Sequence, residues 1–275
     1  MVLIPPVSGI SLNRSTFEKK EDILPAEEEA VGAPVWYSQL DTVSFGMTWK
    51  NVVGGFVVYP ALIIFGCLYF DTRLAEFVSE KVGLGFLLSE EVSNMPDLLF
   101  VLVCAITAVS WIGRLYLSQK STMKWDPSFL EFIGCAIPLA FLLKTILKGL
   151  FGRTTARLWL LHPDQFGFHW FHGGGEFSAF PSGHMAVFTA LMLGIGRYFP
   201  RLRPVCAGLL FVLALALIVT QYHFFSDIVA GVYLGLIVDL LTCRGLSLLH
   251  HQTDRVRILR KDARADSIPD IRGRR

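Results

Sequence analysis

Charged residues are scarce in this sequence. Asp, Glu, Lys and Arg make up 17% of its 275 residues and hydrophobic residues 53%, and the mean hydropathy is +0.51. Soluble domains average roughly 45–50% apolar and about 25% charged residues. The shortage of charge excludes an ordinary soluble domain and predicts an integral membrane protein with a single membrane domain.

Cysteine is also rare, and a strong net charge is absent. The five cysteines lie within or at the edge of apolar runs, where cysteine behaves as a small hydrophobe, so we expect neither a disulfide nor a CxxC metal site. The formal net charge of +2 is too small to indicate nucleic-acid binding. Residues 1–10 lack the basic start and long apolar stretch of a signal peptide.

Long apolar runs dominate the rest of the chain. They cover residues 52–70, 97–118, 128–147, 182–197, 204–222 and 224–243. Most are near the roughly 20 residues that a helix needs to cross a bilayer. We therefore predict an all-α, integral membrane six-helix bundle over 52–243. A loosely ordered cytoplasmic tail over 1–51 precedes it, and a basic cytoplasmic tail over 244–275 follows it.

The distribution of lysine and arginine predicts which side of the membrane each loop occupies. Basic residues gather after the second, fourth and sixth apolar runs, namely Arg114, Lys120 and Lys124, then Arg197, Arg201 and Arg203, then nine residues from Arg244 to Arg275. By the positive-inside rule these three regions are cytoplasmic, and so are both termini.

The first outer loop, residues 71–96, has a pattern of its own. Acidic residues outnumber basic ones there, while Leu74, Phe77, Val78 and Val82 recur at helical spacing. This pattern predicts an amphipathic interfacial helix after the first span. An ordinary solvated loop is the alternative.

The remaining outer segments, residues 148–181 and the junction at 223, carry the candidate site. Ionisable groups at membrane helix ends are functional candidates because their burial is costly unless they are paired. The candidates are Lys148, Arg153, Arg157, His184, His223 and Asp227. Interfacial snorkelling is the alternative for the arginines and is favoured for Arg157. It does not explain the histidines.

The stretch Pro181-Ser182-Gly183-His184 precedes an apolar helix. Proline suits the first turn of a helix, so Ser182, Gly183 and His184 would occupy the helix start, where free N–H groups and the positive dipole end attract an anion. Gly183 would let a ligand approach the backbone and Ser182 would add a hydrogen bond. Lys148 and Arg153 would supply charge to a phosphate.

His223 and Asp227 are spaced as one turn of the sixth helix. Residues four apart share a helical face, so the carboxylate can hold the imidazole in one tautomer. A histidine oriented in this way is a nucleophile or a base. With His184 it allows a division of labour in which one histidine attacks phosphorus and the other protonates the leaving oxygen.

Other histidines suggest a second kind of site. His162, His169 and His172 are close enough in sequence for metal binding, but they lie in an aromatic loop without a close carboxylate or thiolate. Interfacial packing is therefore favoured for them, and lipid gripping is a secondary role for the aromatic residues. For Asp239 in the last run, a capping or interfacial position is favoured over a proton path.

Three motifs together resemble the signature of the type 2 phosphatidic acid phosphatase (PAP2) superfamily. These are Lys148 with Gly152-Arg153, FPSGH at 180–184 and HFFSD at 223–227, and the resemblance spans about residues 97–243. It implies a six-helix membrane core, no metal or other cofactor, a phosphohistidine intermediate on His223 and His184 as general acid. The stretch from FGRTT to PSGH further resembles a bacterial branch, which implies the inner membrane and a site on its outer side.

Two positions depart from the family's pattern. Where the first motif usually has Arg-Pro, this chain has Thr155-Ala156, and where the third motif usually has arginine, it has Leu217. Both missing groups contact phosphate in the family, and leucine cannot replace a charge-assisted contact. Arg157 is a candidate replacement for the first.

The leading hypothesis is a membrane phosphatase that acts on a lipid phosphate or diphosphate. Phosphatidylglycerophosphate, phosphatidic acid and polyprenyl diphosphate are candidate substrates. A lipid phosphotransferase of the same chemistry and a phosphate-lipid binding protein with little turnover are alternatives. A transporter is disfavoured because no pair of interrupted helices occurs in matching halves. The expected partners are the lipid substrate and membrane lipids, and the sequence does not indicate an oligomeric state.

Overall fold

The computed structural model describes residues 42–43, 47–82, 95–119 and 128–266. Over these residues the chain is helical, apart from loops and one short antiparallel strand pair formed by β1 (Thr42–Val43) and β2 (Met47–Thr48). The main helices are α1 (Trp49–Phe65), α2 (Asp71–Val82), α5 (Met95–Gln119), α6 (Ser128–Phe151), α7 (Ala156–Leu161), α8 (Gly183–Tyr198), α9 (Arg203–Val219) and α10 (Phe225–Asp266). The predicted all-α membrane fold is confirmed.

Five of the described helices are long and apolar enough to cross a membrane: 54–82, 98–119, 128–151, 200–219 and 225–253. The fourth predicted run, residues 182–197, forms α8, which has 16 residues. A helix of that length rises about 24 Å, less than the roughly 30 Å of a hydrocarbon core. The six predicted runs therefore correspond to five helices long enough to span a membrane and one shorter helix, α8.

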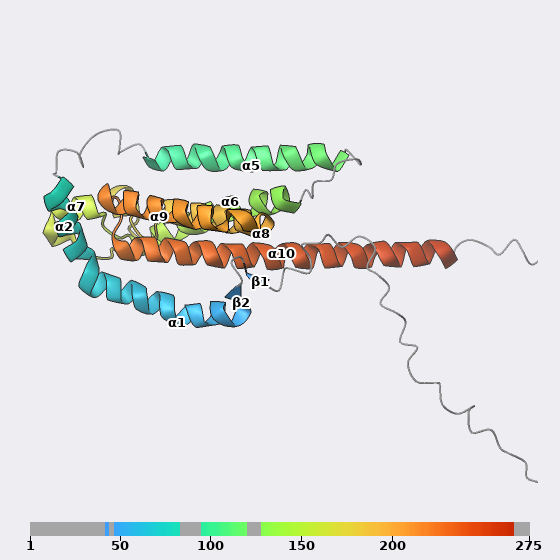
Figure 1. The fold of residues 1–275 in the computed structure, drawn as a ribbon, viewed down its shortest axis with the longest axis horizontal. Coiled ribbons are helices and arrows are strands. Elements are labelled where there is room, and N and C mark those ends of the chain that lie inside the picture. Colours follow the sequence, from blue (N-terminus) through green and yellow to red (C-terminus); the bar gives the residue numbers. More distant parts are fainter. Residues whose placement is uncertain (1–41, 44–46, 83–94, 120–127, 267–275) are drawn as a thin grey trace, which may run out of the picture. The chain divides into compact units, whose positions relative to one another are not determined.

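The short helix α8 is at the centre of the packing. It packs against α6, α9 and α10, while α5 packs on α6 and α1 on α10. Figure 1 shows these helices running alongside one another. The main core joins α6, α8 and α10 through Phe132, Ile137, Ala186, Ala190 and Val238. Small residues at these contacts let the helix backbones approach closely, which is how helices associate where lipid surrounds them.

Helices α2 and α10 differ from the sequence expectation, α2 at its start and in the face that it packs against the protein, and α10 at its end. The segment after the first span is helical as predicted, but α2 follows α1 through a π-helical turn, Gly66–Phe70, without an intervening loop. The face of α2 that packs against the protein carries Asp71, Ala75 and Val78, whereas Phe77, predicted for the apolar face of an interfacial helix, is exposed. At the other end, α10 continues past residue 244, where we placed the start of the tail.

The five cysteines are free thiols. Asp239 is fully buried in α10, where it pairs with Arg197 of α8 at 2.6 Å. The capping or interfacial position that the sequence favoured for Asp239 is therefore wrong. The pairing with Arg197 does not support the alternative of a proton path. The division into domains at 51 and 243 stays a prediction.

Candidate active site

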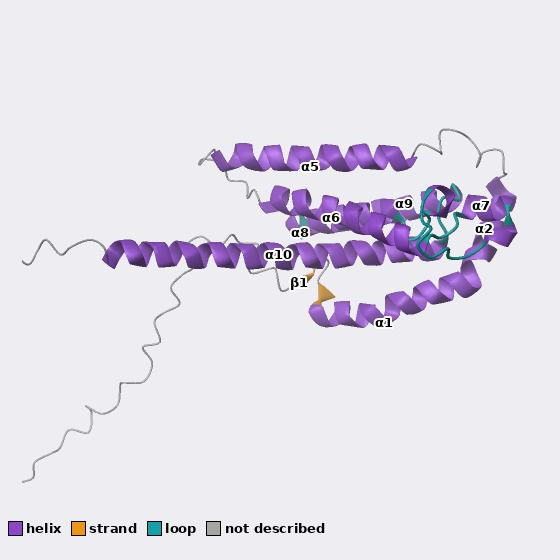
Figure 2. Cartoon of the chain, turned by 180° about the vertical axis from the view of Figure 1, so that it is seen from behind, coloured by secondary structure: helices purple, strands orange, loops and turns teal. Residues whose placement is uncertain are grey.

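The loop between α6 and α8 carries much of the predicted site, and backbone hydrogen bonds fix its path. Figure 2 shows loops gathered near α7 and α2. The Gly152 N–H donates to the Lys148 carbonyl (3.0 Å), and the Ala179 N–H donates to the Arg153 carbonyl (3.0 Å). Gly152 has a φ of 56°, and a side chain there would collide with the His169 carbonyl. Glycine meets both conditions, so the chain can turn sharply after α6.

The N-terminus of α8 forms one wall of the site. Ser182 is the N-cap residue: its hydroxyl accepts a first-turn N–H at 3.5 Å, and its own N–H donates to the Asp227 carbonyl at 3.0 Å. Gly183 and His184 are the first helical residues. Pro181 therefore precedes the cap and does not lie in the first turn as predicted, because Ser182 takes the capping position. The first N–H groups of a helix lack intrahelical acceptors and favour an anion.

His223 and Asp227 meet at the start of α10. The helix begins at Phe225, so His223 lies in the preceding turn and does not share a helical face with Asp227 as predicted. The helix starts here because Asp227 Oδ2 accepts the Phe224 N–H at 2.8 Å, which caps the first turn. His223 Nδ1 lies 3.7 Å from the same oxygen. This distance exceeds a hydrogen bond but permits strong electrostatic interaction between buried groups.

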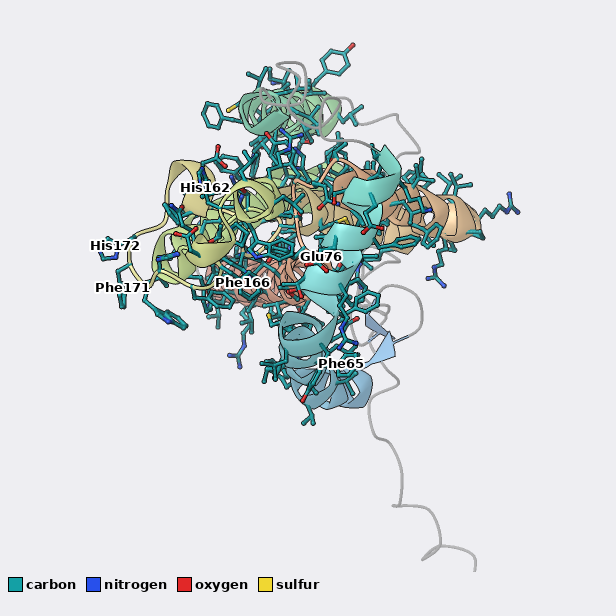
Figure 3. The ribbon with its side chains drawn as sticks, turned by 90° about the vertical axis from the view of Figure 1, so that its left-hand side faces the viewer. Phe65, Glu76, His162, Phe166, Phe171 and His172 are labelled. Atoms are coloured by element: carbon teal, nitrogen blue, oxygen red, sulfur yellow. The ribbon has the colours of Figure 1, made fainter. Side chains whose placement is uncertain are left out.

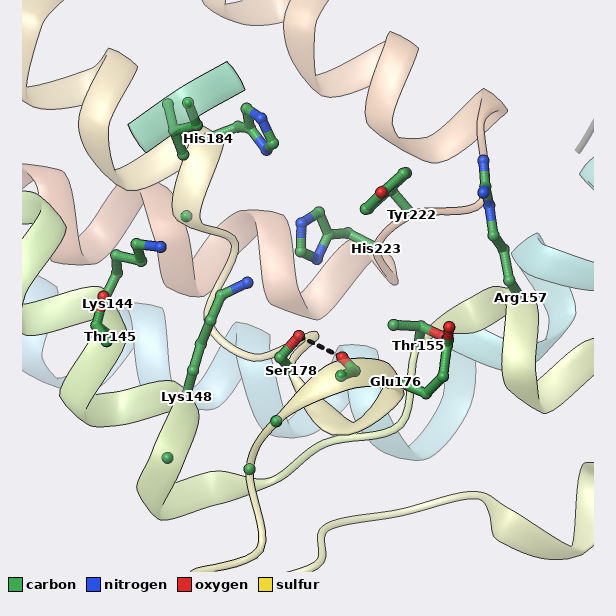
Figure 4. A pocket seen from close by; sticks show the side chains of 16 residues that line it. Lys144, Thr145, Lys148, Thr155, Arg157, Glu176, Ser178, His184, Tyr222 and His223 are labelled. Atoms are coloured by element: carbon green, nitrogen blue, oxygen red, sulfur yellow. Dashed lines mark hydrogen bonds between the residues drawn. The ribbon is translucent and has the colours of Figure 1, made fainter. Parts of the chain in front are cut away.

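Both helix starts open onto one cavity of about 610 Å³. Figure 4 shows Lys148, His184 and His223 pointing into the same space. Five of the predicted site residues line this cavity: Lys148, Arg157, Gly183, His184 and His223. The other three, Arg153, Ser182 and Asp227, are buried at 0–1% exposure and are not among its lining residues in the described part of the chain. The cavity thus combines two histidines with cationic groups.

A second lysine in the cavity escaped the sequence reasoning. Lys144 lies one turn before Lys148 on α6, and its Nζ is 3.9 Å from the centre of the Phe141 ring. Its stem lies so close to Gly183 that a Cβ there would be 3.1 Å from Lys144 Cδ. Gly183 therefore makes room for a lysine beside the start of α8. The four-residue spacing of the two lysines was the available signal, because it places both on one helical face.

Arg153 is placed differently from the expectation of direct phosphate contact. Its guanidinium donates to Asp71 Oδ2 (2.6 Å) and to Asp227 Oδ1 (2.5 Å), and also to Ser226 Oγ (2.6 Å). The Phe168 and Phe224 rings lie about 5 Å from the guanidinium, with centroid distances of 5.0 and 4.8 Å. The terminal nitrogens of the guanidinium are thus hydrogen-bonded to protein groups behind the cavity wall. Asp71 gave no sequence signal because it belongs to an acidic segment far away in the chain.

Burial and neighbouring charge set the ionisation of the site residues outside the spanning helices. Burial lowers the pKa of His223 below its ordinary 6.5, and the Lys148 charge acts in the same direction, whereas the Asp227 carboxylate raises it. Burial also lowers the pKa of Arg157. For Arg153 burial acts in the same direction, but the carboxylates of Asp227 and Asp71 outweigh it and raise the pKa. At pH 7 His223 is therefore neutral, with a lone pair available for attack on an electrophile.

The two positions that depart from the PAP2 pattern have structural roles here. Thr155 is the N-cap residue of α7 and its hydroxyl donates to Glu176 at 3.0 Å. Leu217 is buried in an apolar cluster with Met185 and Ile228. Arg157 lines the cavity near Thr155 while its guanidinium donates to the Thr220 carbonyl at 3.1 Å. It is thus held beside the cavity.

The aromatic loop projects several large side chains outward. Phe171 is 77% exposed and Trp170 56%, and Figure 3 shows Phe171 and His172 pointing away from the helices. The His169 ring packs against Phe177, with centroids 4.6 Å apart. Within the described ranges, no group of three or more His, Cys, Asp or Glu side chains is suited to hold a metal ion. The packing interpretation of His169 agrees with this contact.

The fold and the site together define a membrane helix bundle with a histidine pair beside a cationic cavity. Residues 130–249 match the family model of the PAP2 superfamily. A curated relative is the protein named Lipid A 1-phosphatase from Rhizobium johnstonii, which is 31% identical over 126 residues. The match covers 46% of this chain and 50% of the relative, so the chain spans about half of the relative's length. No solved structure matches.

Proposed function

We propose that this protein is a membrane phosphatase that removes phosphate from a lipid phosphate or diphosphate through a phosphohistidine intermediate. The observation that carries the proposal is the convergence of His184, His223 and Lys148 on one cavity at the starts of two helices. The PAP2 match supports the same chemistry.

In the first half of the reaction, His223 attacks phosphorus. Its Nδ1 faces Asp227, so Nε2 is the attacking nitrogen. The N–P bond forms while the bond between phosphorus and the lipid oxygen breaks. His184, protonated at this stage, donates its proton to the leaving oxygen, so the lipid departs as a neutral alcohol.

In the second half, water attacks the phosphohistidine. His184 is now neutral and accepts a proton from the water as the new O–P bond forms and the N–P bond breaks. Inorganic phosphate leaves, His223 returns to its neutral form, and His184 is protonated for the next cycle. If a lipid hydroxyl replaced the water, the same steps would make the protein a phosphotransferase.

The cavity supplies positive charge to the phosphoryl group from its own side chains. Lys144 and Lys148 lie beside the start of α8, and Arg157 lies elsewhere on the cavity wall. Fixed cations and helix N–H groups of this kind stabilise the charge of a transferring phosphoryl group. The Ser182 N–H donates to the Asp227 carbonyl and so holds the start of α8 against α10.

The relative's name and the membrane-spanning helices indicate which lipids to test as substrates. Its name adds the 1-phosphate of lipid A to the candidates from the sequence: phosphatidylglycerophosphate, phosphatidic acid and polyprenyl diphosphate. The apolar spans make the protein integral to the membrane. We further propose the bacterial inner membrane with the cavity on the outer side, since the basic joints occupy the other.

The test is release of inorganic phosphate by purified protein from each of these four lipids, with and without a chelator. We expect release from at least one lipid, undiminished by the chelator and inhibited by orthovanadate, which adopts the geometry of the transferring phosphoryl group. Binding without release would instead indicate a phosphate-lipid binding protein. Activity that needs added magnesium would contradict the charge supply from lysine and arginine.

A further inference from the structure

A carboxylate outside the cavity is built into the catalytic end of the protein. Asp71, the first residue of α2, is 1% exposed. Its Oδ2 accepts from Arg153 (2.6 Å) and from the Ser226 hydroxyl (2.5 Å), and its Oδ1 accepts the Ser226 N–H (2.9 Å). A buried carboxylate is stable only when it is paired and hydrogen-bonded, and Asp71 meets that condition entirely through residues beside the site.

The contacts form a chain from Asp71 to the nucleophile. Arg153 places one terminal nitrogen on Asp71 and the other on Asp227 Oδ1. The second oxygen of Asp227 accepts the Phe224 N–H and lies 3.7 Å from His223 Nδ1. Because each oxygen of Asp227 is held by a different donor, its carboxylate has one orientation. That orientation presents Oδ2 to the imidazole.

The charges in this cluster do not cancel. Two carboxylates, Asp71 and Asp227, surround a single guanidinium, so the buried cluster carries a net charge of −1. Without Asp71, Arg153 would neutralise Asp227 alone, and His223 would face a cluster with no net charge. The negative field matters when His223 becomes a cation or a phosphohistidine, since a buried positive charge needs a counter-charge.

We propose that Asp71 is a positioning residue of the active site, which acts through Arg153 to fix Asp227 and to maintain negative charge behind His223. The inference rests on the proposed phosphohistidine function. It assigns to the start of α2, outside the matched PAP2 segment, a part in the reaction.

Contacts of α2 beyond Asp71 agree with this role. The Gln221 side chain donates to the Ala75 carbonyl at 3.0 Å. Ala75 also packs in a buried cluster with Trp159 and Phe224. The turn that carries His223 is therefore held against α2 on both sides.

The experiment is a double-mutant cycle of Asp71→Asn and Arg153→Met, with kcat and KM measured for a lipid phosphate. We expect Asp71→Asn to lower kcat by up to about 10²-fold, the loss typical of a small misplacement of reacting groups, with KM unchanged. In the Arg153→Met background the same change should cause no further loss. Losses that multiply independently would overturn the proposal.

Asp239→Asn is the matched control. It removes the carboxylate of a second buried Arg–Asp pair, that of Asp239 with Arg197. Asp239 lies about 18 Å from Asp227 along α10, at twelve residues of helical rise. Thermal unfolding should show both variants destabilised, but only Asp71→Asn should lower kcat. Equal loss of kcat in the two variants would reduce Asp71 to a general structural role and overturn the proposal.

A readout independent of turnover separates this inference from the proposed function. The imidazole of His223 is titrated by NMR in ¹⁵N-histidine-labelled protein, with its signal assigned by His223→Ala. The charges that act on it directly are Asp227 and Lys148, with Arg153 paired to Asp227 behind them and Tyr222 alongside. Asp71→Asn should lower the pKa of His223 and Asp239→Asn should not. An unchanged titration contradicts the proposal, whereas a shifted titration in a protein without turnover contradicts only the phosphatase.

Discussion

His184 and His223 enter the cavity from different helix starts, and their surroundings suit the different tasks that we propose for them. His223 is buried beside a carboxylate, whereas His184 is half-buried at the first turn of α8. A buried neutral imidazole is suited to attack phosphorus, and a partly exposed one can exchange protons with solvent.

His184→Ala tests the assignment of the acid. With a lipid phosphate, whose alkoxide needs a proton to leave, we expect a loss of kcat of about 10²–10⁴-fold. With an aryl phosphate whose phenol has a low pKa, the loss should be much smaller. Steady-state kinetics on the two substrates makes the comparison, and equal losses would remove the case for His184 as the acid.

The pH dependence of kcat/KM follows from the lowered pKa of His223. The nucleophile must be neutral, so activity is retained at neutral pH and falls as the pH drops through a pKa that lies below 6.5. In Asp227→Asn the carboxylate that raises this pKa is gone, so the acid limb should move to lower pH. Ionisation of the substrate affects both proteins equally, so it does not contribute to the difference between their pH profiles. A shift of the acid limb to higher pH would contradict the electrostatic account.

The site residues that could be predicted from the sequence are those that lie close to one another in the chain. Ser182, Gly183 and His184 are adjacent in the chain, and His223 and Asp227 are four residues apart. Asp71 and Arg153 could not be paired in advance, since only the packing of α2 against the start of α10 brings them together. Arg153 was assigned to phosphate for the same reason: its buried partners were unknown.

At the scale of elements, glycine controls how closely α8 and α10 approach. A Cβ added at Gly231 of α10 would lie 2.6 Å from the Ser182 carbonyl. That contact is beside the cap of α8 and one turn from Asp227. The approach of the two helices therefore sets the relation between the two halves of the site.

Gly231→Ala should separate the two helix starts. We expect a destabilisation of about 1–3 kcal/mol from overpacking, together with a loss of activity. Gly245→Ala on the same helix is the control, since a Cβ there meets nothing within 4 Å. Thermal unfolding and phosphate release measure the two effects, and equal behaviour of the variants would show that the close contact has no role.

Helix positions were more predictable than helix ends. The apolar runs at 97–118 and 204–222 correspond to α5 and α9 within a few residues, because composition determines where a chain can cross lipid. The end of α10 at Asp266 was not predicted, since a polar helix beyond the membrane leaves no apolar signal. The side of α2 that packs on the protein was not predicted, because a charged residue, Asp71, lies on it.

For the whole molecule, the account requires the cavity to face away from the cytoplasm. Two variants are made in a cysteine-free background. His172→Cys places a thiol on the exposed loop beside the site, and Arg201→Cys places one on the joint after α8. A membrane-impermeant thiol reagent added to intact cells should label the first and not the second. Labelling of both from one side would contradict the orientation derived from lysine and arginine.

The central claim is tested most directly by trapping the covalent intermediate. Purified protein is mixed with a lipid phosphate carrying ³²P, quenched within the first turnover and analysed for protein-bound phosphate. The account predicts an acid-labile, alkali-stable phosphoenzyme on His223 that is absent in His223→Ala, which should also have lost turnover. A fully active His223→Ala protein, or a phosphoenzyme on another residue, would contradict it.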